Sequence, residues 1–134
     1  MDFTVRIDNT KGIVVVPVTG ACDRNGMVRM ANEARIAAQS AGLPILYDMR
    51  AATPGELARA DIFWLAQSLP APRDGNAGRV RMATVYPPGF GALARFWEDS
   101  YNNVGIEARV FESGDEAVAW LRGSEPASGA RGGR

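Results

Sequence analysis

Residues 46 to 57 read LYDMRAATPGEL, and this stretch decides the fold because it joins a hydrophobic strand to the signals of a helix start. The apolar run that begins at residue 44 leads into Asp48 and Arg50, which is typical of a buried strand with a polar end. The next signal, Thr-Pro-Gly-Glu at positions 53 to 56, matches a capping box with Thr53 as the N-cap. We therefore expect a strand over residues 44 to 50 and a helix over residues 53 to 69.

Two β-rich runs precede this unit, over residues 3 to 8 and 12 to 18. Only three residues separate them, which is typical of an antiparallel hairpin. The second run is apolar at nearly every position and predicts a strand that is covered on both faces. Pro17 cannot donate a ladder hydrogen bond, so we expect it near a strand end or at a bulge. A helix follows over residues 23 to 41, for which Asp23 or Asn25 can provide the N-cap.

The chain continues with predicted strands over residues 79 to 86 and 107 to 111, and with predicted helices over residues 90 to 104 and 113 to 121. The order β-β-α-β-α-β-α-β-α predicts one α/β domain over residues 1 to 122. Its sheet is mixed, mostly parallel and five-stranded, it opens with an antiparallel hairpin, and four helices pack on it. Residues 123 to 134 are small, polar and glycine-rich, which predicts a disordered tail.

Composition excludes several classes of function. The 15 basic and 15 acidic residues give a net charge of zero, so the chain lacks the positive excess of a broad nucleic-acid-binding face. The longest apolar run is about six residues, too short to cross a bilayer, and the N-terminus lacks a signal-peptide pattern, so we expect a cytoplasmic protein. There is no histidine and one cysteine, Cys22, which rules out a Ser-His-Asp or Cys-His mechanism. We expect a protein that is not an enzyme and holds no metal or cofactor.

The chain resembles the STAS-like proteins related to bacterial anti-sigma-factor antagonists, in the branch grouped with CRAL-TRIO-like lipid-binding domains. The resemblance covers residues 3 to 122 and rests on the strand-helix order with its opening hairpin, on PILYDMR at residues 44 to 50, and on ARVFESGDEAVAWL at residues 108 to 121. It implies a non-catalytic regulatory or binding domain. Antagonists of this family begin the helix after this strand with a phosphorylated serine that precedes a glycine. Here that position is Pro54, which has no hydroxyl group.

A polar rim is the candidate site for a partner loop or a small anionic ligand. Parallel strands end at one edge of a sheet, which predicts that the following residues gather there: Cys22, Asp23, Asp48, Arg50, Thr53 and Tyr86. A helix that begins at Thr53 would add partial positive charge, with Arg50 as a second anchor. For each of three residues we favour a structural role: Asp48 and Arg50 can pair with one another, and a lone cysteine is more often a small buried hydrophobe than a reactive thiol.

Phe63 and Trp64 are the candidate self-association residues, together with Leu57. The helical spacing of residues 58, 62, 65 and 69 predicts the face that packs on the sheet, and it leaves Leu57 and Trp64 on a flank and Phe63 nearly opposite. An interface, cover by loops and an apolar ligand pocket are all open interpretations. We expect a regulatory protein-interaction module that forms a homodimer and binds a regulatory partner. The alternative is a carrier or sensor of a lipid or other apolar small ligand.

Overall fold

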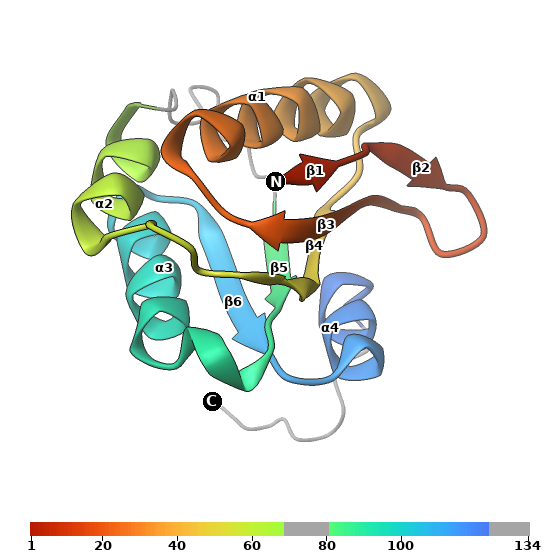
Figure 1. Cartoon of the computed structure of the whole chain (residues 1–134). Helices are drawn as coiled ribbons and strands as arrows, with labels where there is room; N and C mark the ends of the chain where they lie inside the picture. Colours follow the sequence, from red (N-terminus) through yellow and green to blue (C-terminus); the bar gives the residue numbers. More distant parts are fainter. Residues whose placement is uncertain (69–80, 124–134) are drawn as a thin grey trace.

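A computed structural model of the chain describes residues 1–68 and 81–123. Its central sheet contains four parallel strands that follow one another in sequence order, namely β3 (Ile13–Ala21), β4 (Ile45–Thr53), β5 (Arg81–Val85) and β6 (Glu107–Phe111) (Figure 1). β1 (Asp2–Phe3) and β2 (Arg6–Asp8) both pair antiparallel with β3. The predicted mixed sheet with an opening hairpin is confirmed, with the first predicted strand divided into two short ones. The predicted tail lies, from residue 124 on, outside the described residues.

Within the described residues four α-helices pack on the sheet, as predicted. α1 (Arg24–Ala41), α2 (Arg59–Ser68) and α3 (Ala92–Asn103) cover one face, and α4 (Gly114–Leu121) covers part of the other (Figure 1). A short 3-10 helix, η1 (Pro88–Phe90), precedes α3. Each parallel strand is added on the same side of its predecessor, and right-handed crossovers then place all three connecting helices on one face. The loops after β3, β4 and β5 therefore all lead to that face.

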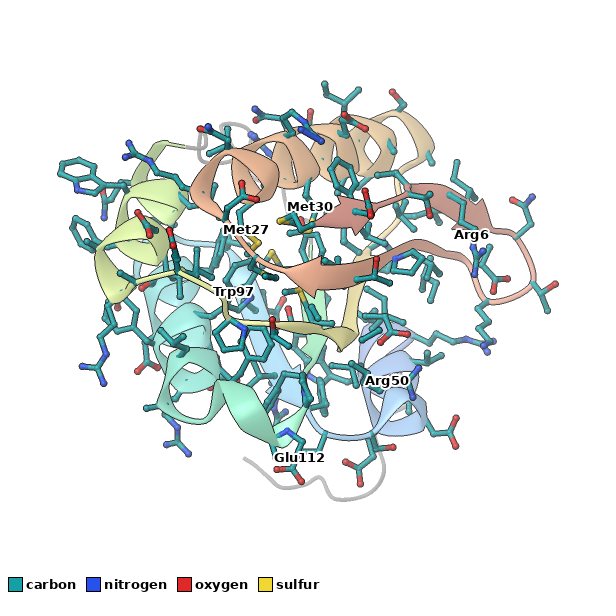
Figure 2. All side chains as sticks on the ribbon, viewed as in Figure 1. Arg6, Met27, Met30, Arg50, Trp97 and Glu112 are labelled. Carbon is teal, nitrogen blue, oxygen red and sulfur yellow. The ribbon has the colours of Figure 1, made fainter. Side chains whose placement is uncertain are left out.

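The larger core lies between this face and α1 to α3. Figure 2 shows Met27, Met30 and Trp97 pointing into it from α1 and α3, where all three side chains are buried. The smaller core lies beneath α4, where Trp120 packs with Leu46 and Ala83. Trp97 and Trp120 are both buried. None of the helices described over residues 1–68 and 81–123 combines the length and the apolar character that a membrane-crossing helix needs.

Local signals predicted several boundaries correctly. Asp23 is the N-cap of α1 and accepts a hydrogen bond from the Gly26 N–H at 2.7 Å. Ser113 caps α4 in the same way through the Glu116 N–H at 3.3 Å. The register of β3 against β4 shifts between Pro17 and Thr19, next to the proline that removes a ladder donor.

The predicted helix start at Thr53 is wrong. Thr53 is the last residue of β4, where it pairs with Ala21 of β3 and its carbonyl accepts a hydrogen bond from the Cys22 N–H at 2.9 Å. A turn follows, closed by the Leu57 N–H and the Pro54 carbonyl at 2.9 Å, and α2 begins only at Arg59. Pairing with β3 thus prevails over the capping box, and it gives the Thr53 carbonyl a backbone partner within the sheet.

The outer edge of β6 is closed by side chains of α3. Asn102 donates from its amide to the Ala108 carbonyl at 3.0 Å and accepts from the Ala108 N–H at 3.1 Å. Glu98 accepts from the Val110 N–H at 3.0 Å. These bonds take the place of a neighbouring strand, and an edge strand whose backbone groups are occupied is a poor template for pairing with another chain.

We expect Asn102→Ala to lower the free energy of unfolding by about 1–2 kcal/mol, because it removes two hydrogen bonds from a partly buried strand edge. It should also raise the tendency to aggregate through β6. Urea denaturation and light scattering measure the two effects. Asn103→Ala is the matched control, since the described residues show no side-chain hydrogen bond for Asn103. Equal behaviour of the two variants would contradict the closure of this edge by Asn102.

Candidate functional site

Asp48 and Arg50 form a bidentate ion pair on β4. The Arg50 Nε lies 2.9 Å from Asp48 Oδ1, and its Nη2 lies 2.8 Å from Oδ2. Leu46 belongs to the core under α4 whereas Tyr47 and Met49 belong to the opposite core, so strand alternation places the ion pair on the α4 face. The hydrogen bond from Arg50 lowers the pKa of Asp48. Each charge already has its partner, as the structural interpretation predicted.

Arg50 is exposed and lies beside the start of α4, as Figure 2 shows. Cys22 and Asp23 occupy a different part of the molecule. The Cys22 side chain is 1% exposed within the larger core, and burial raises the pKa of its thiol to about 11. A thiol with this pKa is almost fully protonated near neutral pH and is a poor nucleophile. Asp23 caps α1, and its carboxylate lies 3.9 Å from the N-terminal amine of Met1.

Tyr86 packs against the larger core and lines a shallow recess of about 750 Å³ beside α3 and β6. The recess gathers side chains of both charges: Arg59, Arg95, Glu98, Asp99 and Arg109. The structure therefore brings Cys22 and Tyr86 to the face with α1 to α3, and Asp48 and Arg50 to the face with α4. The predicted rim residues do not form one site, because Asp48 and Arg50 point to the opposite face of the sheet from Cys22 and Tyr86. Thr53 remains next to Cys22 through the backbone hydrogen bond at the end of β4.

The anion cradle expected at Thr53 to Glu56 is also absent, because no helix begins there. The first turn of α2 instead contains Asp61, whose Oδ2 accepts from the Ala58 N–H at 3.0 Å. A carboxylate of the chain itself thus occupies this helix N-terminus, and its negative charge already complements the helix dipole. A bound anion at α2 would be repelled by Asp61.

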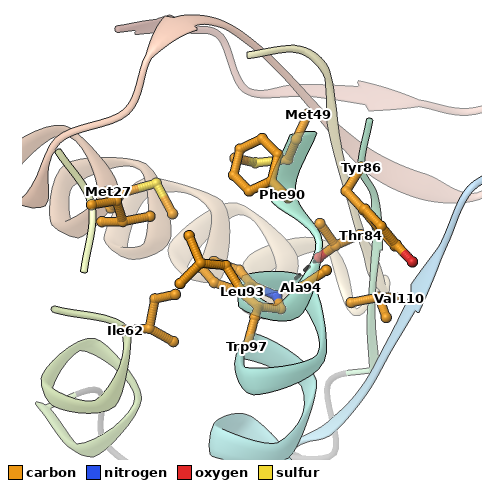
Figure 3. A pocket seen from close by; sticks show the side chains of 11 residues that line it. Met27, Met49, Ile62, Thr84, Tyr86, Phe90, Leu93, Ala94, Trp97 and Val110 are labelled. Carbon is orange, nitrogen blue, oxygen red and sulfur yellow. Dashed lines mark hydrogen bonds between the residues drawn. The ribbon is translucent and has the colours of Figure 1, made fainter. Parts of the chain in front are cut away.

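An apolar cavity lies between α3, η1 and the sheet (Figure 3). Its free volume is about 20 Å³, which is room for about one water molecule. Of its lining side chains, the buried Thr84 hydroxyl accepts a hydrogen bond from Trp97 Nε1 at 3.0 Å, and Phe90 and Met49 are buried hydrophobes. A lipid could enter only if several of these packed side chains moved.

Phe63 and Trp64 form an exposed aromatic pair on α2. Their rings meet edge to face with centroids 5.5 Å apart, and the two residues are 43% and 60% exposed. The inner side of α2 is packed, with Ile62 and Leu65 buried in the larger core. The helical spacing thus predicted the orientation of all four side chains although it misplaced the helix start.

A groove between α1 and α2 adjoins the aromatic pair. This α1–α2 groove has a free volume of about 180 Å³ and is mainly apolar; its lining residues are Arg24, Met27, Val28, Leu57, Asp61, Trp64 and Leu65. Leu57, predicted on the helix flank, lies in the turn before α2 and is 8% exposed. The contribution of α1 was missed in the sequence, although Val28 is an apolar residue one position beyond the core residue Met27.

Comparisons of the chain with protein-family models, with curated proteins and with solved structures find no match. The resemblance to the STAS-like family therefore stays a prediction from the sequence.

Proposed function

We propose that this chain is a non-enzymatic regulatory module of the STAS-like type, and that it acts by binding a protein through the aromatic pair. The observation that carries the proposal is the exposure of Phe63 and Trp64 at 43% and 60% above a well-packed core. Large aromatic side chains are enriched in protein interfaces and among their energetically dominant residues. Helix α2 needs neither ring for its own packing, since Ile62 and Leu65 already fill its inner face.

The polar residues support binding over turnover. Asp48 is held by Arg50, and the Cys22 thiol is buried with a raised pKa. A general base or nucleophile needs a free group with a pKa near the working pH, and neither residue offers one. The alternative function, a carrier of an apolar ligand, is favoured by the cavity behind Phe90, but its free volume of about 20 Å³ is far below the roughly 300 Å³ of small-molecule sites.

A native mass spectrum of freshly purified protein tests the choice between module and carrier. We expect every species observed to have the mass of one or more polypeptide chains without a ligand, because the cavity behind Phe90 has a free volume of only about 20 Å³. Denaturing extraction followed by mass spectrometry of the small molecules is the control for a ligand that dissociates in the gas phase. A stoichiometric apolar ligand in either measurement would overturn the module and favour the carrier.

A further inference from the structure

We propose that a second copy of this chain occupies the α1–α2 groove. In this dimer, Trp64 of each protomer lies against the groove of the other, and Arg24 of each faces Asp61 of the other across a two-fold axis. The inference rests on the proposed function, because it names the partner of the same aromatic pair.

The size and chemistry of the groove suit one large apolar side chain. Its free volume is about 180 Å³, and Met27, Val28, Leu57 and Leu65 give it an apolar lining. Sites for drug-sized small molecules begin at roughly 300 Å³. A projecting side chain from another protein surface is therefore the better match for the groove than a free small molecule.

The chain itself presents a side chain of this kind beside the groove. Trp64 is the largest of the exposed hydrophobic residues among those the structure describes, at 60% exposure. Phe63 supports it edge to face, which limits its freedom before binding. One surface thus carries both a projection and a recess, and this is the requirement for a closed contact in which the same patch serves both subunits.

The groove contains one positive and one negative residue, so its charges are complementary to those of a second copy of the same groove. Arg24, the first residue of α1, and Asp61, in the first turn of α2, are its two charged lining residues. Within residues 1–68 and 81–123 neither side chain forms an ion pair, and the Asp61 carboxylate accepts a hydrogen bond from the Ala58 N–H. A two-fold axis through the patch brings each Arg24 toward the partner's Asp61. An unrelated protein would need a matching pair of its own, whereas a second copy supplies it by symmetry.

Sedimentation velocity of the full chain over a range of concentrations tests the inference. We expect a wild-type dimer, and we expect Trp64→Ala and Phe63→Asp each to raise the dissociation constant about 30-fold or more, as the loss of a dominant aromatic contact does. Ile36→Asp is the matched control. Ile36 is 66% exposed on α1 and does not line the groove, so this variant should stay dimeric.

Charge reversal tests the pairing of Arg24 with Asp61. Arg24→Glu should raise the dissociation constant about tenfold by placing two acidic groups together at each end of the contact. Adding Asp61→Lys should restore dimerisation. Circular dichroism checks that α2 survives this change, because Asp61 also accepts a hydrogen bond at the helix start. A reversal without effect, or without rescue in a folded double variant, overturns the pairing.

Two outcomes overturn the dimer as a whole. One is a wild-type chain that stays monomeric at the highest concentration reached, and the other is a dimer that Trp64→Ala and Phe63→Asp leave intact. Neither outcome bears on the ligand measurement that tests the module against the carrier, so failure of the dimer and failure of the proposed function are distinguishable. In the first outcome the aromatic pair would serve a different protein.

Discussion

Trp97→Ala is expected to lower the free energy of unfolding by about 3–5 kcal/mol, the range measured for truncation of large buried aromatic residues. Trp97 lies on α3 and is 5% exposed. Its ring meets Tyr47 edge to face with centroids 6.0 Å apart and lies 5.0 Å from the ring of Tyr101. Truncation would open a large cavity and disrupt this aromatic cluster, which joins α3 to β4. Urea denaturation followed by circular dichroism measures the loss.

The contribution of the Trp97 hydrogen bond to the free energy of unfolding can be separated from the contribution of its apolar ring. Trp97 Nε1 donates to the buried Thr84 hydroxyl at 3.0 Å. Trp97→Phe keeps a ring but leaves that hydroxyl without its donor, which should cost about 1–3 kcal/mol. Thr84→Val added to Trp97→Phe removes both polar partners and should recover part of the loss. If the two changes are simply additive, the hydrogen bond does not contribute as the geometry indicates.

Trp97 also illustrates what the sequence predicts well. The three- and four-residue spacing of apolar residues from 90 to 104 identifies both the helix and its buried face, because a helical period depends only on residues close in the chain. The same reasoning correctly placed Phe63 and Trp64 away from the core face of their helix. Their helix begins later than predicted, but the phase of a helical face does not depend on where the helix starts.

The rest could not be predicted because it depends on contacts between distant segments. Nothing local to Thr53 shows that it pairs with Ala21, so the capping box dominated the interpretation. The prediction that the polar rim forms one site was wrong for a related reason. The strands were predicted in the right order, but β3 and β4 run on to Ala21 and Thr53, three residues beyond their predicted ends. Asp48 and Tyr86 also lie on opposite faces of the sheet, and the faces are known only once the strand order and helix positions are known. The α1–α2 groove likewise joins residues of two helices that the sequence alone does not place side by side.

The second large expected effect concerns Gly55, in the turn that replaces the predicted helix start. Its φ is +58°, in the left-handed region that disfavours other residues by about 1–2 kcal/mol. A Cβ atom at this position would lie 2.6 Å from the Cys22 carbonyl oxygen and 3.0 Å from the Ala21 Cβ. The backbone of Cys22 cannot easily retreat, because its N–H donates to the Thr53 carbonyl.

Gly55→Ala is therefore expected to destabilise the fold by about 3 kcal/mol or more, the sum of backbone strain and of steric overlap with a fixed backbone. Gly42→Ala is the matched control. Gly42 has a φ of +69° but no heavy atom within 4 Å of its hypothetical Cβ, so this variant should show only the strain, about 1–2 kcal/mol. Urea denaturation of both variants isolates the steric part as their difference. Equal losses would mean that the turn at residues 54 to 57 can move away from the end of β3. In that case the close contact between Gly55 and the Cys22 backbone would not fix the position of Leu57 in the lining of the α1–α2 groove.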